Sequence, residues 1–119
     1  MDRVVYMELA GVKYPLLFSM KAFIDIINKF NSLAEAIKAM ETDYDSQFEM
    51  ACILSSAAAE YLKREKKKAP TLTKEMLEFG SPYEIANGLL KSIMECIGKG
   101  GERTVEAEES SKNAETAQG

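Results

Sequence analysis

Few residues of this chain are of a type that could carry out chemistry, and those few lack partners. The sequence has no histidine, so the commonest acid–base group and metal ligand is missing. Ser55 and Ser56 have neither a histidine nor a suitably placed lysine to activate a hydroxyl group, and they read as small packing residues. We therefore expect no catalytic residue and no enzyme activity.

Two short patterns resemble ligand-binding loops but are incomplete. Asp43-Tyr44-Asp45 resembles the start of a calcium loop, yet it lacks the glycine at the sixth position and the glutamate at the twelfth. The glycine-rich stretch at 98–101 follows a predicted helix instead of opening one, so it does not match a phosphate-binding loop. We expect neither a metal site nor a cofactor-binding site.

The two cysteines, Cys52 and Cys96, fall inside predicted helices and do not form a CxxC pair. Buried cysteines usually behave as small hydrophobic residues. A disulfide would be unexpected in a reducing cytoplasm. We therefore interpret both as buried free thiols.

The composition sets further limits. At 119 residues the chain is one domain's worth, and a net charge of −4 gives it no electrostatic attraction to nucleic acid or anionic membranes. The longest uncharged stretch in the centre, residues 50–59, is far shorter than the about 20 residues that cross a bilayer. The N-terminus has no basic region followed by an apolar run, so we expect no signal peptide and a cytoplasmic protein.

The basic run from Lys63 to Lys68 is the one feature that could suggest nucleic-acid binding, because lysine and arginine neutralise phosphates. The run is short, it lies at the end of a predicted helix, and no helix-turn-helix pairing is visible around it. We interpret it as a solvated helix end. The alternative is an electrostatic contact with an acidic protein segment, such as this chain's own tail.

The N-terminal segment, about residues 3–18, predicts a β-hairpin with Ala10-Gly11 as a two-residue turn. This register places Glu8 opposite Lys13, a favourable pair of opposite charges. It also puts three apolar pairs on one face: Leu9 with Val12, Met7 with Tyr14, and Val5 with Leu16.

The second face of this hairpin is unusually apolar for a surface in water. It carries Val4, Tyr6 and Leu17. A lone hairpin is marginally stable, so its first face must lie on the helices. We therefore take these three residues as the candidate partner or oligomer surface.

Helical periodicity and capping residues predict about five helices after the hairpin. Ser19 caps the first, Ser32 with Glu35 caps the second, Thr73 the fourth, and Ser81-Pro82-Tyr83-Glu84 opens the fifth, which Gly98 ends. The third begins in an acidic run and ends in the basic run, as the helix dipole favours. Its middle, residues 50–59, is apolar or small all round and predicts a buried central helix.

The sequence thus predicts a mainly α protein with a small N-terminal antiparallel β-hairpin, an α+β arrangement around a compact helical bundle. Residues 1–97 form the single domain. Residues 98–119 hold few apolar side chains, three basic and five acidic residues, and predict a disordered acidic tail.

Seven methionines are many for this length. Flexible thioethers suit adaptable binding surfaces. The simpler interpretation is that methionines fill gaps in the core, namely Met20, Met40, Met76 and Met94.

The order of these elements resembles a known family. A strand ends in Tyr14-Pro15-Leu16, a capped helix follows, and Phe30-Asn31-Ser32 forms a corner before the next helix. With the long alanine-rich helix, the basic stretch, a short helix opened by Leu-Thr, a final helix and an acidic tail, roughly residues 4–97 resemble the tail assembly chaperones of siphophages and related prophages. Asn31 stands where glycine is expected, a substitution that left-handed backbone tolerates.

The resemblance implies a non-enzymatic role. Such proteins bind the long helical tape measure protein, keep it soluble and help to recruit tail tube protein. They self-associate, act in the cytoplasm of the bacterial host and are absent from the mature virion. A small phage-encoded regulatory adaptor and a structural tail or head-completion protein are the alternatives.

Overall fold

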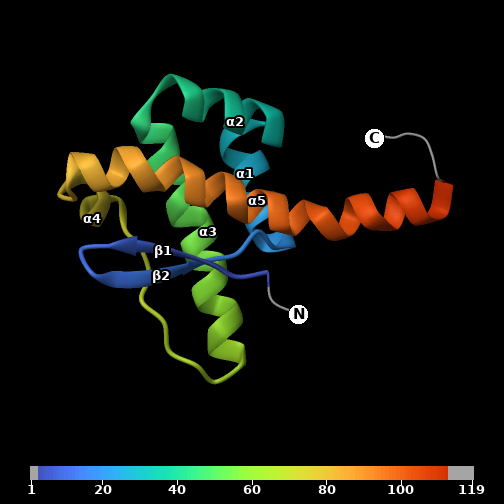
Figure 1. Ribbon diagram of the computed structural model, residues 1–119, viewed down its shortest axis with the longest axis horizontal. Coiled ribbons are helices and arrows are strands. Elements are labelled where there is room, and N and C mark those ends of the chain that lie inside the picture. The colour runs from blue at the N-terminus through green and yellow to red at the C-terminus, as the bar shows by residue number, and fades with distance from the viewer. Residues whose placement is uncertain (1–2, 113–119) are drawn as a thin grey trace.

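The computed structural model describes residues 3–112 of the chain, with side chains described over residues 3–100. This part of the chain forms a two-stranded antiparallel hairpin and five helices (Figure 1). In chain order they are β1 (Val5–Leu9), β2 (Val12–Leu16), α1 (Met20–Phe30), α2 (Leu33–Thr42), α3 (Tyr44–Arg64), α4 (Lys74–Glu78) and α5 (Pro82–Lys112). The predicted fold class is confirmed.

The hairpin has the predicted register, with Leu9 opposite Val12 and Glu8 opposite Lys13. Ala10 and Gly11 form the turn, and both have positive φ, 53° and 81°. Two positive φ angles are what a two-residue turn needs to match the twist of the strands. The Ala10 N–H donates to both carboxylate oxygens of Glu84 at 3.0 and 3.2 Å, so the turn is tied to the first turn of α5.

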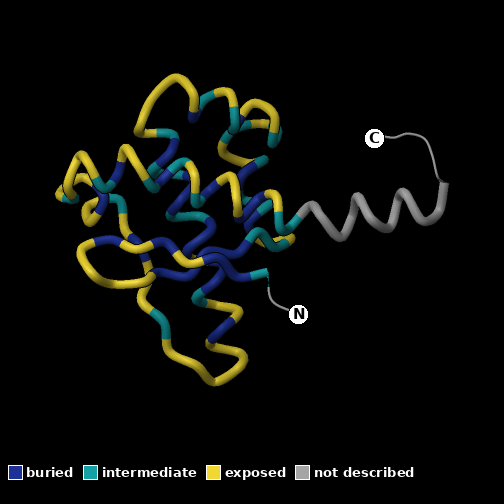
Figure 2. Tube along the Cα trace, viewed as in Figure 1, coloured by how far each residue is buried: buried dark blue, intermediate teal, exposed yellow. Residues whose placement is uncertain are grey.

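Two helices enclose the hairpin from opposite sides. β1 packs against α5, and β2 packs against α3, which crosses behind the strands in Figure 1. The backbone of the chain leaving β2 is also fixed to α3, because the Leu17 N–H donates to the Leu54 carbonyl at 3.0 Å. The hairpin is therefore held by both helices. Buried and exposed residues alternate along β1, and β2 is exposed at its start and buried at its end (Figure 2).

The helix α3 is the central element, as predicted. It contacts β2, α1, α2, α4 and α5. Met50, Ala51, Leu54 and Ala58 in its middle are completely buried. Ser55 is buried too, and its hydroxyl accepts a 2.7 Å hydrogen bond from the Leu72 N–H, which holds the connection between α3 and α4.

Side-chain caps define the helix starts that the sequence indicated. The hydroxyl groups of Ser19, Ser32 and Thr73 each accept a backbone N–H in the first turn of the following helix. Asp43 caps α3 in the same way, at 2.7 Å from the Ser46 nitrogen. This hydrogen bond lowers the pKa of the Asp43 carboxyl group, because it favours the charged form.

The end of α5 differs from the prediction. The sequence predicted that this helix ends at Gly98, and that boundary is wrong, because α5 continues to Lys112. Gly98 is not among the residues with positive φ, so it does not form a left-handed cap. The residues after it include lysine, arginine, glutamate and alanine, which favour helix. Of the predicted tail, 113–119 lies outside the described residues.

Gly100 has a packing role in this extended helix. A Cβ atom added there would lie 2.5 Å from Cδ2 and 3.0 Å from Cβ of Phe18. The Phe18 ring is itself held edge-on against Phe23, with ring centroids 6.0 Å apart. A glycine at this position thus allows α5 to approach the segment between β2 and α1.

The end of α3 is closed by a left-handed residue. Lys66 has φ 61°, its N–H donates to the Lys63 carbonyl at 2.9 Å, and the Lys67 N–H donates to the Leu62 carbonyl at 2.9 Å. This pair of bonds is the Schellman arrangement, in which glycine is the usual left-handed residue.

We predict that Lys66→Gly raises the free energy of unfolding by about 0.5–1 kcal/mol, because glycine adopts positive φ without a Cβ clash. Urea denaturation monitored by circular dichroism measures the change. Lys68→Gly is the matched control, because Lys68 does not have positive φ and gains nothing from glycine. Equal effects of the two substitutions would contradict the prediction.

A second pair of variants tests the continuation of α5. Gly98→Ala should stabilise the protein by up to about 1 kcal/mol, because a Cβ there meets no atom within 4 Å and alanine favours helix. Gly100→Ala should leave the stability unchanged or lower it, because the added Cβ meets Phe18. Thermal melts of both variants give the comparison. A helix that ended at Gly98 would make Gly98→Ala neutral or destabilising.

Candidate functional site

The three residues that the sequence assigned to an outward surface differ in their exposure to solvent. Tyr6 is 53% exposed, as predicted, but Val4 is only 7% exposed and Leu17 only 3%. The prediction is therefore wrong for Val4 and Leu17, which pack with Ala58 of α3. The small Ala58 side chain lets α3 approach closely enough to cover this face of the hairpin.

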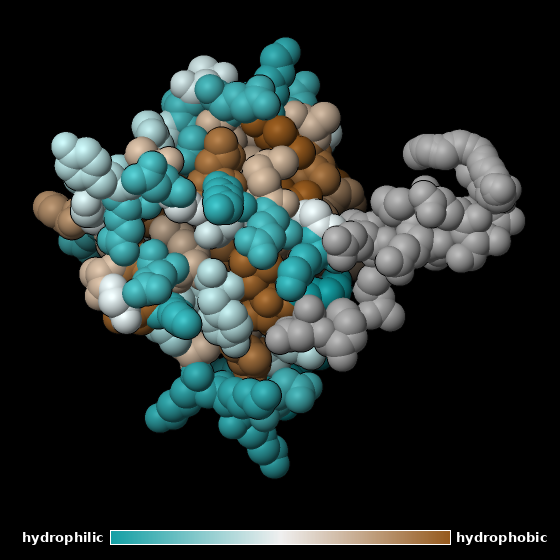
Figure 3. All heavy atoms as spheres, in the orientation of Figure 1, coloured by the Kyte–Doolittle hydropathy of each residue, from teal (hydrophilic) through white to brown (hydrophobic). Residues whose placement is uncertain are grey.

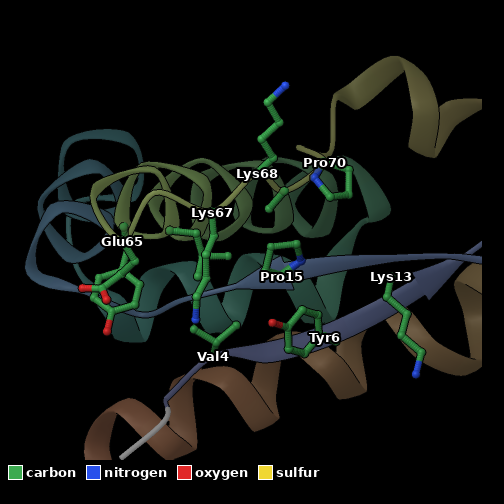
Figure 4. Close-up of a pocket in the computed structure, with 11 residues that line it drawn as sticks. Val4, Tyr6, Lys13, Pro15, Glu65, Lys67, Lys68 and Pro70 are labelled. Carbon is green, nitrogen blue, oxygen red and sulfur yellow. The ribbon is translucent and has the colours of Figure 1, made fainter.

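The cover is incomplete, and a hollow of about 480 Å³ remains between the hairpin and the end of α3. Its hairpin side is formed by Val4, Tyr6 and Pro15, and its α3 side by Tyr61 and Leu62. Figure 4 shows these strand residues facing the chain that follows α3, which closes the hollow at residues 65–70.

A second hollow of about 280 Å³ lies on the other side of Tyr61. Leu17 and Ala57 line it together with Met20 at the start of α1 and Arg64 at the end of α3. Because Tyr61 lines both hollows, we treat them as one surface and call it the Tyr61 groove. All three residues that the sequence singled out lie in it, two as buried wall and Tyr6 as an exposed side chain.

Exposed apolar side chains from three elements meet along the Tyr61 groove. Tyr6 comes from β1, Tyr61 from α3 and is 42% exposed, and Met20 comes from α1 and is 67% exposed. Ile24, one helical turn beyond Met20, is 50% exposed. Apolar surface drawn together from separate elements is typical of a binding surface for another protein chain.

Sequence reasoning missed Tyr61 and Met20. Tyr61 follows the buried segment of α3, and no pattern in the sequence shows that the hairpin stops covering the helix there. The interpretation of methionines as core residues is correct for Met40, which is 1% exposed. It is wrong for Met20, and Met76 and Met94 are also exposed, at 42% and 39%.

Charge is segregated along α3. At its start, Lys74 of α4 lies 2.6 Å from Asp45 and 3.4 Å from Glu49, and Lys29 of α1 lies 3.5 Å from Glu49. These ion pairs join three helices, and the hydrogen bond to Asp45 raises the pKa of Lys74. At the other end the Tyr61 groove is lined by six basic and two acidic side chains.

Two further apolar areas reach the surface. At the corner between α4 and α5, Phe79 is 83% exposed and Tyr83 is 82% exposed, beside a hollow of about 470 Å³ lined mainly by polar residues of β1 and α5. Figure 3 also shows hydrophobic atoms between the positions of α2 and α5. Neither area combines exposed aromatic side chains with a basic lining as the Tyr61 groove does.

The residues that could do chemistry are engaged elsewhere or inaccessible. Burial raises the pKa of the Cys96 thiol to about 12, and burial also raises the pKa of Cys52, which is half-buried. Ser55 is held by its bond to Leu72. Within the described residues, no cluster of three or more cysteine, aspartate and glutamate side chains could hold a metal ion.

Within the described part of the chain, no helix is long and apolar enough to cross a membrane. Comparison of the chain with protein-family models, with curated proteins and with solved structures finds no match.

We predict that Cys96 resists alkylation in the native state. With its pKa raised to about 12, the thiolate fraction at pH 8 is on the order of one in ten thousand, and the thiolate is the reactive form. Mass spectrometry after treatment with iodoacetamide at pH 8 should find Cys96 unmodified in the native protein and modified in urea. Rapid native labelling of Cys96 would contradict its buried position on α5 beside Phe18.

Proposed function

We propose that this chain is a non-enzymatic tail assembly chaperone of a siphophage or related prophage. In this role it binds the tape measure protein, keeps it soluble and aids assembly of the tail tube protein. It acts as a homo-oligomer in the cytoplasm of the bacterial host and is absent from the mature virion.

The observation that carries the proposal is the Tyr61 groove. Tyr6, Tyr61 and Met20 expose apolar surface from three elements around hollows that adjoin each other. An amphipathic helix binds a partner by placing its apolar face in such a groove. A tape measure protein consists largely of long helical segments with apolar faces, so the groove offers the contact that would keep such segments in solution.

The resemblance in the order of elements supports the same role. The capped corner at Asn31 is formed as that resemblance expects, since Asn31 ends α1 with φ 81° and Ser32 caps α2. A binding role also fits the state of the two thiols, whose raised pKa values make them poor nucleophiles.

The self-association part of the proposal needs a different surface from the one that the sequence suggested. Val4 and Leu17 are buried inside one subunit, so they cannot form a contact between subunits without unfolding. Tyr44 at the start of α3 is 52% exposed and is an aromatic side chain available for it, at the end of α3 opposite to Tyr61.

Co-expression with the tape measure protein tests the proposal. We predict that the wild-type chain moves the tape measure protein into the soluble fraction. The double variant Tyr6→Ser and Tyr61→Ser should weaken the complex about tenfold or more, because exposed aromatic anchors dominate such interfaces. Both side chains are about half exposed and lie outside the buried core, so the fold should survive, which circular dichroism verifies.

The matched control is Phe79→Ser with Tyr83→Ser, which removes two exposed aromatic side chains from the other side of the hairpin. It should leave solubilisation of the tape measure protein unchanged. If this control loses binding and the groove variant keeps it, the site is misplaced. A tape measure protein equally insoluble with and without the wild-type chain would refute the chaperone role.

A further inference from the structure

The Tyr61 groove is basic in an acidic protein. Its lining residues include six lysine and arginine side chains and two glutamates, whereas the whole chain has a net charge of −4. The basic residues are Arg3, Lys13, Lys21, Arg64, Lys67 and Lys68. The sign of the charge is therefore a local property of this surface.

Most of this charge is not neutralised within the described chain. Lys21 pairs with Asp25 at 3.2 Å, and Arg3 donates to the Phe18 carbonyl. Lys13, Lys67 and Lys68 form no ion pair with another described residue, and neither does Arg64.

Most of the basic side chains lie at the edges of the apolar surface, and one of them, Lys67, extends across it. Figure 4 shows Lys67 reaching across the hollow toward Val4, while Lys68 and Lys13 point away from it on opposite sides. Arg64 and Lys21 line the second hollow beside Met20. A ligand that covered Tyr6 and Tyr61 would thus meet positive charge along its borders.

We infer that the Tyr61 groove binds an amphipathic helix whose apolar stripe is flanked by aspartate or glutamate. This inference rests on the proposed function and specifies which segments of the partner bind. Along α3 and its C-cap residue, the groove runs from Ala57 to Glu65, about 12 Å at 1.5 Å per residue. That length accommodates about two turns of a bound helix, with apolar anchors at i, i+3 or i+4, and i+7.

Single-stranded nucleic acid would also favour a basic groove with aromatic side chains. Two features favour a protein helix. The lining is rich in aliphatic side chains, among them Val4, Leu17, Ala57 and Leu62, which offer no stacking surface to a base. Glu60 and Glu65 also lie in the lining, where they would repel phosphates.

Fluorescence anisotropy with labelled 20-residue peptides that tile the tape measure protein tests this inference. We expect the tightest peptides to carry an apolar stripe with acidic flanks, and their affinity to fall with rising salt. The double variant Arg64→Glu and Lys67→Glu should weaken them about tenfold. Lys38→Glu with Lys91→Glu, two exposed lysines outside the groove, makes the same change in net charge and should have little effect.

A designed pair of peptides separates this inference from the proposed function. Both carry the same leucine stripe, one with glutamate flanks and one with lysine flanks. The wild-type chain should prefer the glutamate peptide about tenfold, and the Arg64→Glu, Lys67→Glu variant should reverse the preference. Thermal melts verify that the variant is folded.

The outcomes are distinct. If the tape measure protein is solubilised but its binding segments are not acidic, or the charge reversal has no effect, this inference is overturned and the proposed function stands. If no segment binds and solubilisation fails, the proposed function is refuted, while a preference for the glutamate peptide still supports the groove chemistry. Tighter binding of a labelled oligo-dT of 20 nucleotides than of any acidic peptide would overturn the inference in favour of nucleic acid.

Discussion

The fold depends on the need to cover most of the surface of one helix, α3. The middle of α3 is apolar or small all round, and a helix of this kind is stable only when other elements surround it. The chain supplies β2, α1, α2, α4 and α5 as that cover. The hairpin, which would be marginal alone, is stable because it lies between α3 and α5. Small residues such as Ala51 and Ala58 let these neighbours come close, and Ser55 fixes the returning chain through the Leu72 N–H.

Local features were predictable because they depend on short-range physics. The alternation of apolar residues gave the hairpin register, and the turn at Ala10-Gly11 follows from it. The caps at Ser19, Ser32 and Thr73 follow from hydroxyl groups placed before apolar periodicity. These features need no knowledge of which elements lie next to each other.

The errors came from tertiary packing. Alternation shows that Val4, Tyr6 and Leu17 share a face, but it does not show whether that face is covered. In the structure α3 covers Val4 and Leu17 and leaves Tyr6 exposed at the edge of the contact. The candidate surface therefore contains only one exposed hairpin residue of the predicted three, and it also includes residues of α1 and α3. The end of α5 also depends on tertiary packing. Glycine ends a helix when it adopts positive φ, and Gly98 does not adopt it. The helix α5 therefore continues past Gly98, and Gly100 lies close to Phe18.

The position and the charge of the Tyr61 groove both follow from the way α3 ends. The buried segment of α3 is flanked by acidic residues at its start and basic residues at its end, the arrangement that a helix dipole favours. The last turns of α3 run past the edge of the hairpin, so Tyr61 is covered on one side only. The same basic residues that suit the end of the helix therefore border the apolar surface that the hairpin leaves open. The preference for acidic flanks on a bound helix then follows from the end of α3 itself. The basic residues that stabilise this helix end are also the residues that border the exposed apolar surface.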